Sequence, residues 1–332
     1  MKKFLARILG IVAGLTACAS VAGCKDKEEI LIYTSIEDYT IEYMQEMFED
    51  KLPDYDIKIE YMSTSNIAAK VLAEGTSSDC DIIFAEEYGY VEKMAAAGVL
   101  AKLSESYDQS VFTEESLLTE AKEYVLPTIK TGGAVILNTK VLTDKGLAKP
   151  TSYADLLKPE YKGLVSMPSP KSSGTGYMFY LSLVNAWGEE TALEYFDDLT
   201  PNILAYTTSG SGPVNALTSR EAAVGMGMIS QAAEKLSEGV SELEIVVFDE
   251  GAPFNLYGNC VVKGKEEKAG VKAVMDYLYS EFTDLCNAKY YPETVLKDKA
   301  YEVANFPQNI KYADMKNNTL ANKEGLLEKW TH

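Results

Sequence analysis

The sequence predicts an α/β fold with two lobes. The chain has 332 residues, which is long for one compact core and suits two α/β lobes of ordinary size. Short apolar runs alternate with segments of helical periodicity, and glycine and proline separate them. Strands and helices that alternate in series form βαβ units with a largely parallel sheet and right-handed crossovers. We see no internal repeat.

The first lobe follows a charged spacer. We expect strands at 30–34, 57–61 and 81–85, and helices at 41–52, 66–73 and around Val91, Met94 and Ala95. Residues 103–123 are polar with a helical pattern, so helical structure is expected there as well.

Residues 127–130 and then 132–138 are expected to form an extended crossing into the second lobe, and 251–253 marks the return. The second lobe should contain strands at 163–167, 203–207, 222–229, 245–248 and 256–262 and helices at 176–187 and 193–199. We therefore place the first lobe at 30–127 plus 258–305 and the second at 128–257 plus 306–332.

The first 23 residues predict a secretory signal peptide. Lys2, Lys3 and Arg7 precede the apolar run 8–23, and no acidic residue occurs among them. A transmembrane helix is the alternative, but the run is short and ends at the charged spacer 25–29.

Residues 21–24 resemble the lipobox of bacterial lipoproteins, which implies that Cys24 is lipidated and that 24–29 form an anchor and spacer. Cys18 competes, but Cys24 leaves a longer apolar region before it and meets the spacer directly. Several acyl chains on this residue would hold the protein at a membrane surface.

Charge and side-chain inventory exclude several classes of function. Removal of the signal peptide takes away three basic residues and lowers the net charge from −19 to −22, which disfavours nucleic acid as a partner. The only histidine is His332, so internal Ser-His-Asp or Cys-His catalysis and histidine metal sites are excluded. Cys80, Cys260 and Cys286 form no zinc motif; a disulfide between the last two is possible, but buried thiols are the commoner outcome.

Two clusters of serine, threonine and glycine, 169–176 and 207–213, each lie where an expected strand gives way to a helix. Helix N-termini leave backbone N–H groups unpaired and carry partial positive charge, while glycine lets a ligand approach the backbone. Together the two clusters could hold an oxyanion without arginine. The alternative is that these residues only cap helices and form turns. No Walker loop occurs.

Acidic residues follow two strands of the first lobe: Glu37 and Asp38 after the first, Glu86 and Glu87 after the third. The carboxyl ends of strands are where open α/β sheets bind ligands, and these groups could coordinate a hard cation or pair with an ammonium group. The alternative is that they are solvated surface residues. Candidate aromatic walls of a cleft are Tyr33, Tyr39, Tyr88, Tyr177 and Tyr257.

Sequence segments spread over nearly the whole exported region resemble the iron-, thiamine- and phosphonate-type solute-binding proteins of ABC importers. The segments that carry the resemblance are 31–35, 81–86, 98–100 with Leu103, 133–140, 158–163, 173–174 and 250–253 leading to Gly258. The resemblance implies a type 2 periplasmic-binding-protein fold, with mixed sheets, helices on their faces and hinge strands between the lobes. It also implies a monomer, lipid-anchored outside the cell membrane or periplasmic, that works with a permease and its ATPase.

The resemblance also suggests where the ligand binds. Ferric-binding relatives carry adjacent tyrosines where this chain has Ser230 and Gln231, although Glu37 and Glu86 fall where those relatives place metal ligands. Residues 173–175 correspond to an anion site, and 209–212 resemble the anion loop of phosphonate and sugar-phosphate binders. The expected ligand-binding residues are Thr34, Ser35, Glu37, Glu86, Glu87, Ser172, Ser173, Gly174, Thr175, Thr208, Ser209, Gly210, Ser211 and Tyr257.

We therefore expect a binding protein, not an enzyme, that needs no cofactor and captures a small phosphonate- or phosphate-bearing solute, zwitterions included. Ferric-ion or thiamine binding is the alternative within the class. A secreted hydrolase that uses acidic pairs and an adhesive surface lipoprotein are alternatives from other classes.

Overall fold

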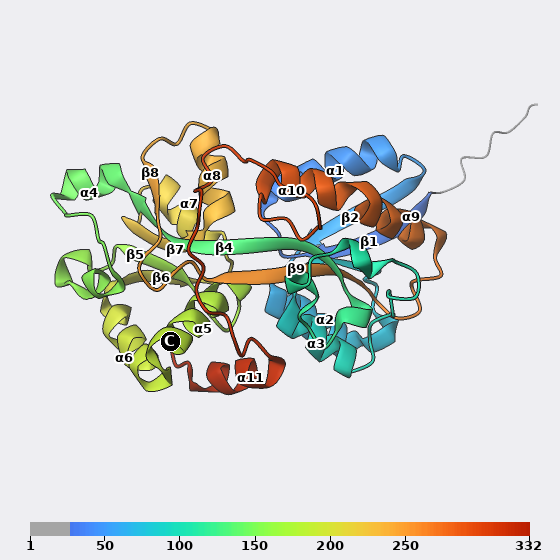
Figure 1. The fold of residues 1–332 in the computed structure, drawn as a ribbon, viewed down its shortest axis with the longest axis horizontal. Coiled ribbons are helices and arrows are strands. Elements are labelled where there is room, and N and C mark those ends of the chain that lie inside the picture. Colours follow the sequence, from blue (N-terminus) through green and yellow to red (C-terminus); the bar gives the residue numbers. More distant parts are fainter. Residues whose placement is uncertain (1–26) are drawn as a thin grey trace, which may run out of the picture.

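The computed structural model describes residues 27–332 (Figure 1). The expected signal peptide, the proposed anchor Cys24 and its competitor Cys18 lie outside the described residues. Within the described part, no helix combines the length and the apolar character that crossing a membrane requires.

Within residues 27–332, nine strands form one continuous mixed sheet in the order β2-β1-β3-β9-β4-β7-β5-β6, with β8 paired to β4. Their bounds are β1 Glu28–Thr34, β2 Tyr55–Tyr61, β3 Ile82–Glu87, β4 Leu126–Asn138, β5 Val165–Pro168, β6 Ile203–Thr207, β7 Val224–Met228, β8 Leu243–Val246 and β9 Phe254–Val261. The pairs β1·β2, β1·β3, β5·β6 and β5·β7 are parallel. The pairs that involve β4 or β9 are antiparallel.

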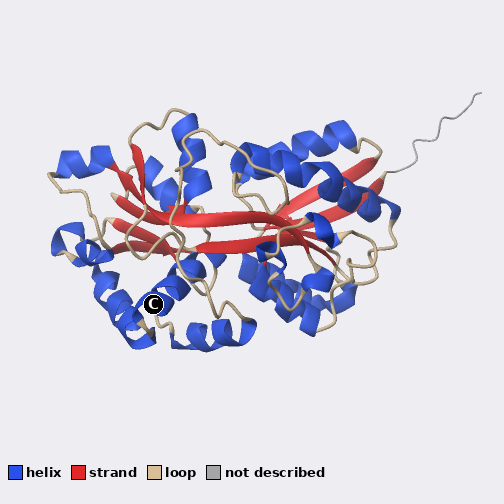
Figure 2. Cartoon of the chain, in the orientation of Figure 1, coloured by secondary structure: helices blue, strands red, loops and turns tan. Residues whose placement is uncertain are grey.

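Helices cover both faces of each half of the sheet, as Figures 1 and 2 show. Their bounds are α1 Asp38–Lys51, α2 Thr64–Glu74, α3 Tyr88–Ala96, α4 Thr139–Lys145, α5 Gly174–Trp187, α6 Glu189–Leu199, α7 Gly212–Thr218, α8 Ile229–Ser237, α9 Ala269–Tyr277, α10 Thr283–Tyr290 and α11 Leu320–Lys329. The predicted two-lobed α/β class with mixed sheets is confirmed.

The long strands β4 and β9 run through the middle of the molecule and belong to both lobes (Figure 1). In the first lobe, apolar side chains form one buried core around Phe84 and Phe282 and another around Val71 and Val91. In the second lobe, the largest core surrounds Phe179. The two halves therefore have separate cores, and paired strands connect them.

A third connection joins the lobes near the C-terminus. Val295 packs in the core of the first lobe, whereas Val303 and Phe306 pack against Ala134 and Ile229 of the second. The chain then pairs with the segment before β9, because the carbonyl of Ala252 accepts a hydrogen bond from the amide of Ala313 at 2.9 Å. The tail thus crosses the hinge alongside β4 and β9.

The prediction of helical structure over 103–123 is wrong, because the segment contains no α-helix. The segment forms only short 3₁₀ turns at Gln109–Val111, Glu115–Leu117 and Lys122–Tyr124. The side chain of Asp108 accepts a hydrogen bond from the amide of Ser110 at 2.8 Å, and such local bonds compete with a regular helix. Cys80, Cys260 and Cys286 are free and buried.

Candidate functional site

A pocket lies where the two lobes meet over the hinge strands. The first lobe contributes the junctions β1–α1 and β2–α2, and the second contributes the junctions β5–α5 and β6–α7. The lining residues are Ser35, Ile36, Glu37, Tyr61, Ser63, Thr64, Ile129, Thr131, Ser172, Ser173, Gly174, Thr175, Thr208, Ser209, Gly210, Met228 and Tyr257. Hydroxyl groups dominate this lining, and within the described residues it includes no lysine, arginine or histidine.

The wall from the second lobe consists of two loops in direct contact. A Cβ atom on Gly210 would lie 2.4 Å from the hydroxyl oxygen of Thr175, so only glycine lets the loops approach this closely. Ser173 caps α5, because its hydroxyl accepts a hydrogen bond from the amide of Gly176 at 3.5 Å. Ser209 and Ser211 share a hydrogen bond at 3.1 Å. Capping therefore explains Ser173, but it does not explain Ser172, Thr208 or Ser209.

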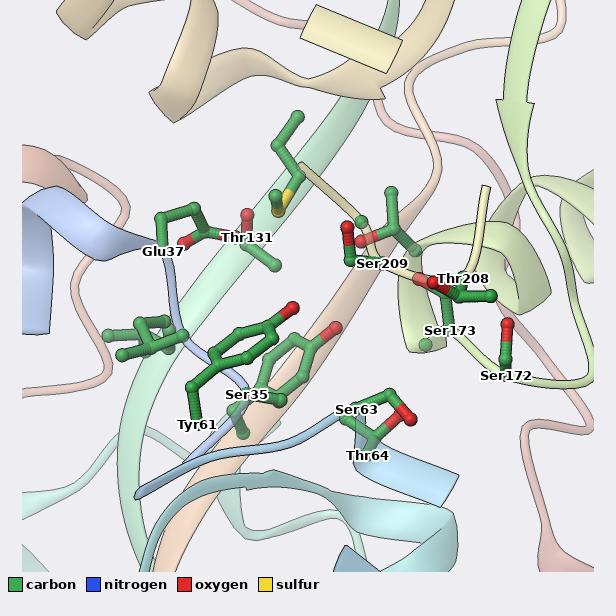
Figure 3. Close-up of a pocket in the computed structure, with 17 residues that line it drawn as sticks. Ser35, Glu37, Tyr61, Ser63, Thr64, Thr131, Ser172, Ser173, Thr208 and Ser209 are labelled. Carbon is green, nitrogen blue, oxygen red and sulfur yellow. The ribbon is translucent and has the colours of Figure 1, made fainter. Parts of the chain in front are cut away.

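In the wall from the first lobe, the two helix N-termini are not capped by side chains. Ser63 stands at the N-cap of α2 and Glu37 at the N-cap of α1, yet neither side chain caps its helix. The positive ends of both helices consequently face the pocket without a side-chain oxygen of their own at the N-cap. Tyr61 is 45% exposed and extends into the pocket from the end of β2, as Figure 3 shows.

Three hydroxyl groups of this lining are buried without a hydrogen-bond partner in the described structure, those of Thr64, Thr131 and Ser172. An unpaired buried hydroxyl costs about 1–3 kcal/mol, so natural proteins seldom retain one without a purpose. The three groups point to a polar solute that supplies the missing partners.

Among the described residues that line the pocket, Glu37 is the only acidic one, and it lies across the pocket from Thr208 and Ser209 (Figure 3). It is 7% exposed and accepts a hydrogen bond from the hydroxyl of Tyr291 at 3.2 Å. Burial raises the pKa of Glu37 to about 7, despite the opposing effect of its hydrogen bonds. The pocket therefore has a carboxyl end and a hydroxyl-and-amide end.

The structure brings together most of the residues expected at the site, but not all. Ser35, Glu37, Ser172, Ser173, Gly174, Thr175, Thr208, Ser209, Gly210 and Tyr257 line the pocket. Thr34 lies behind the lining, where its hydroxyl accepts a hydrogen bond from the amide of Ile36 at 3.2 Å. Ser211 also lies outside the lining, beside Ser209.

Glu86 and Glu87 are likewise outside the lining, and both are fully buried. Glu87 forms an ion pair with Lys323 and accepts a hydrogen bond from the amide of Gly89 at 3.1 Å. One oxygen of Glu86 has no partner among the described residues, and burial, together with the charge of Glu87, raises the pKa of Glu86 well above its usual range. A protonated Glu86 is consistent with this environment.

The pocket residues supplied by the β2–α2 junction and by the hinge were not predicted from the sequence. Tyr61, Ser63, Thr64, Thr131 and Met228 line the pocket but were not expected there. A signal existed for part of this set, since residues 61–65 place two serines and a threonine at a strand-to-helix junction. These residues have the same pattern as the two clusters of the second lobe, without the glycines.

Contacts between the lobes surround the pocket. The hydroxyl of Tyr39 donates a hydrogen bond to Ser230 at 3.4 Å, and the hydroxyl of Ser65 donates to the carbonyl of Ser172 at 3.3 Å. The lobes are therefore closed over the pocket in this structure. Within the described residues, no three histidine, cysteine or acidic side chains lie close enough together to hold a metal ion.

Known proteins share this architecture. The structure of the periplasmic binding protein AfuA from Actinobacillus pleuropneumoniae, with exogenous fructose-6-phosphate bound, is 25% identical with a TM-score of 0.80 and covers 92% of this chain and 98% of its own. The periplasmic binding protein P5PA has a TM-score of 0.79 at 22% identity, over 92% of this chain and 98% of that one. An uncharacterised protein of Haemophilus influenzae is 26% identical over 82% of this chain and 78% of its own length.

The model of one protein family matches residues 77–322, which is most of the chain and includes the second-lobe wall of the pocket. On this match, the chain belongs to the family of bacterial extracellular solute-binding proteins.

Proposed function

We propose that this protein is the lipid-anchored receptor of an ABC importer and that it captures a small phosphonate- or phosphate-bearing solute between its lobes. The closed form would then dock on the permease, with Cys24 as the attachment to the outer face of the membrane. The protein would act as a monomeric receptor without a cofactor, and it would not be an enzyme.

One observation carries the choice of solute. The end of the pocket formed by Ser172–Thr175 and Thr208–Gly210 offers hydroxyls, glycines and the N-terminus of the fourteen-residue helix α5, with no cationic side chain in the described lining. Backbone amides at a helix N-terminus bind oxyanions well, and hydroxyls add further donors. The related AfuA, whose structure holds fructose-6-phosphate, supports the same choice.

Glu37 at the opposite end suggests that the solute also carries a positive group. Neither oxygen of Glu37 pairs with a cation among the described residues, so an ammonium group of the solute could approach the carboxylate. A zwitterion such as an aminoalkylphosphonate fits both ends of the pocket.

Titration calorimetry of the purified protein tests this proposal. We expect 2-aminoethylphosphonate to bind at least about tenfold more tightly than ethylphosphonate, which lacks only the ammonium group. The Glu37→Gln variant should remove that preference, whereas Asp38→Asn, at the exposed neighbouring position, should keep it. Micromolar binding of ferric ion alone, with no binding of any phosphonate or phosphate ester, would overturn the assignment.

Ferric binding is the second candidate, because Tyr61, Tyr257 and Glu37 place two phenols and a carboxyl in one pocket. Oxygen ligands of this kind suit a hard cation. A visible charge-transfer band on addition of ferric ion, lost in Tyr61→Phe, would favour this candidate; no band would count against it.

A further inference from the structure

A buried ion pair connects the lobes beside the pocket. The ammonium group of Lys323, on α11, contacts the carboxylate of Glu87, at the end of β3. Lys323 is 2% exposed and Glu87 is fully buried. The ammonium nitrogen also lies 3.9 Å from the ring centroid of Tyr90 and 4.7 Å from that of Tyr177. Two aromatic faces and one carboxylate therefore enclose a single lysine.

Lys323 is attached to the second lobe. Leu326 and Trp330, on the same C-terminal segment, are buried in the main core of that lobe. The ring of Trp330 lies 5.1 Å from that of Tyr180 and 4.9 Å from that of Phe196, measured between centroids. This packing fixes the end of α11 in the second lobe, so Lys323 moves with it.

Glu87 is attached to the first lobe. It ends a strand of that lobe and caps α3 through its hydrogen bond with the amide of Gly89. Two further contacts join α11 to α3: Glu92 accepts a hydrogen bond from the amide of Leu320 at 3.3 Å, and Lys93 pairs with Glu324 at 2.8 Å. Figure 1 shows α11 bridging the space between α5 and α3.

The ion pair also supports the pocket wall. A Cβ atom on Gly174, which lines the pocket, would lie 3.4 Å from Cγ of Glu87 and 2.9 Å from the hydroxyl of Tyr257. The carbonyl of Gly174 accepts a hydrogen bond from Asn255 at 2.9 Å. The loop that offers hydroxyls to the solute therefore lies close beside Glu87 when the lobes are closed.

We propose that Lys323 and Glu87 form a clasp that favours the closed arrangement of the lobes and, through Gly174, holds the solute-binding loop in position. Both residues are positioning residues, since neither lines the pocket. This inference concerns the opening equilibrium and does not depend on which solute binds.

The expected effect follows from burial. Removal of one partner leaves an uncompensated charge in the interface, whereas replacement of both by uncharged groups is far less costly. Opening of the lobes exposes the remaining charge to water, so the single variant should favour the open form. A solute that requires the closed form then binds more weakly in proportion to the closed fraction.

Small-angle X-ray scattering of the full chain without added solute tests the clasp. We expect Lys323→Met to increase the radius of gyration, and the double variant Glu87→Gln, Lys323→Met to return it toward the wild-type value. Lys93→Met is the matched control, because it removes an exposed ion pair of the same helix interface and should leave the scattering unchanged. Lys323→Gln, a milder change, should shift the scattering in the same direction if Lys323→Met does not fold.

Calorimetry with 2-aminoethylphosphonate as the probe adds a second readout, with an affinity at least about fivefold weaker in Lys323→Met and largely recovered in the double variant. Scattering of Lys323→Met and Lys323→Gln identical to that of the wild type would overturn the clasp. Failure of the probe to bind any variant would count against the proposed solute class, while the scattering comparison would still decide on the clasp.

Discussion

The two walls of the pocket differ in how tightly they are packed and in how their helix N-termini are capped. The wall from the second lobe is packed tightly, with Gly210 where the two loops touch and Ser173 capping its own helix. The wall from the first lobe is looser, with the half-exposed Tyr61, a serine at an N-cap that caps nothing, and the buried carboxyl of Glu37. The comparison suggests that the second lobe presents a preformed anion site, while the first lobe contributes selectivity for the rest of the solute.

The largest effect that can test this contrast concerns the charge on Glu37. Burial raises the pKa of Glu37 from 4.5 to about 7. The stability that the neutral carboxyl provides is therefore fully present below about pH 4.5 and is lost as the pH rises from there to about 7. Between about pH 4 and about pH 8 the wild type should lose about 3 kcal/mol of unfolding free energy relative to Glu37→Gln.

Urea unfolding of both proteins over this pH range measures the difference. Parallel pH profiles for the wild type and Glu37→Gln would show that the carboxyl is not buried as described, and the contrast between the walls would be lost. Asp38→Asn, at the exposed adjacent position, should follow the wild-type profile.

The second effect tests the tight packing of the other wall. A Cβ atom on Gly176 would lie 2.4 Å from the carbonyl oxygen of Pro168 and 2.6 Å from the backbone of Ser169, so the backbone must move to accept it. Gly176→Ala should lower the unfolding free energy by about 2 kcal/mol and weaken solute binding.

Gly325 provides the matched control for this change. It lies in α11, and a Cβ atom added there would meet no neighbouring atom within 4 Å, so Gly325→Ala should stabilise the helix by about 0.5–1 kcal/mol. Equal effects of the two substitutions in thermal unfolding would argue against a preformed, tightly packed wall.

The smallest effect concerns the floor between the walls. Thr131, on β4, has a buried hydroxyl with no partner among the described residues, and valine has nearly the same shape. Thr131→Val should raise the unfolding free energy by about 1 kcal/mol because the unpaired hydroxyl is removed. The same change should weaken solute binding, as measured by calorimetry; unchanged affinity would show that the hydroxyl does not serve the solute.

The sequence predicts much of the fold because the alternation of apolar runs and helical segments is regular through the first lobe and through 163–229. The prediction fails over 103–123, where local side-chain hydrogen bonds replace a helix. The helices α9, α10 and α11 were not predicted from the sequence. The clusters 169–176 and 207–213 were identifiable because glycine and hydroxyl residues at a strand-to-helix junction form a recognisable pattern.

The positions of the acidic residues relative to the pocket could not be predicted from the sequence. Glu37 and Glu86 both follow strands expected in the first lobe, and nothing in their immediate sequence distinguishes them. In the structure, Ala85 adopts a positive φ of 54° at a bulge in the pairing of β3 with β9. Glu86 and Glu87 are buried outside the pocket lining after this bulge, and Glu87 receives Lys323 from 236 residues further along the chain. Neither a bulge nor so distant a partner can be read from local patterns.

The three connections between the lobes, β4, β9 and the tail near residue 300, limit how the protein can open. Two adjacent strands alone would allow one half to twist as well as bend relative to the other. We expect a third connection beside them to leave rotation about one axis as the easiest motion. A solute should therefore enter and leave along a single route, opposite the hinge, so whatever receives it must approach the molecule from that side.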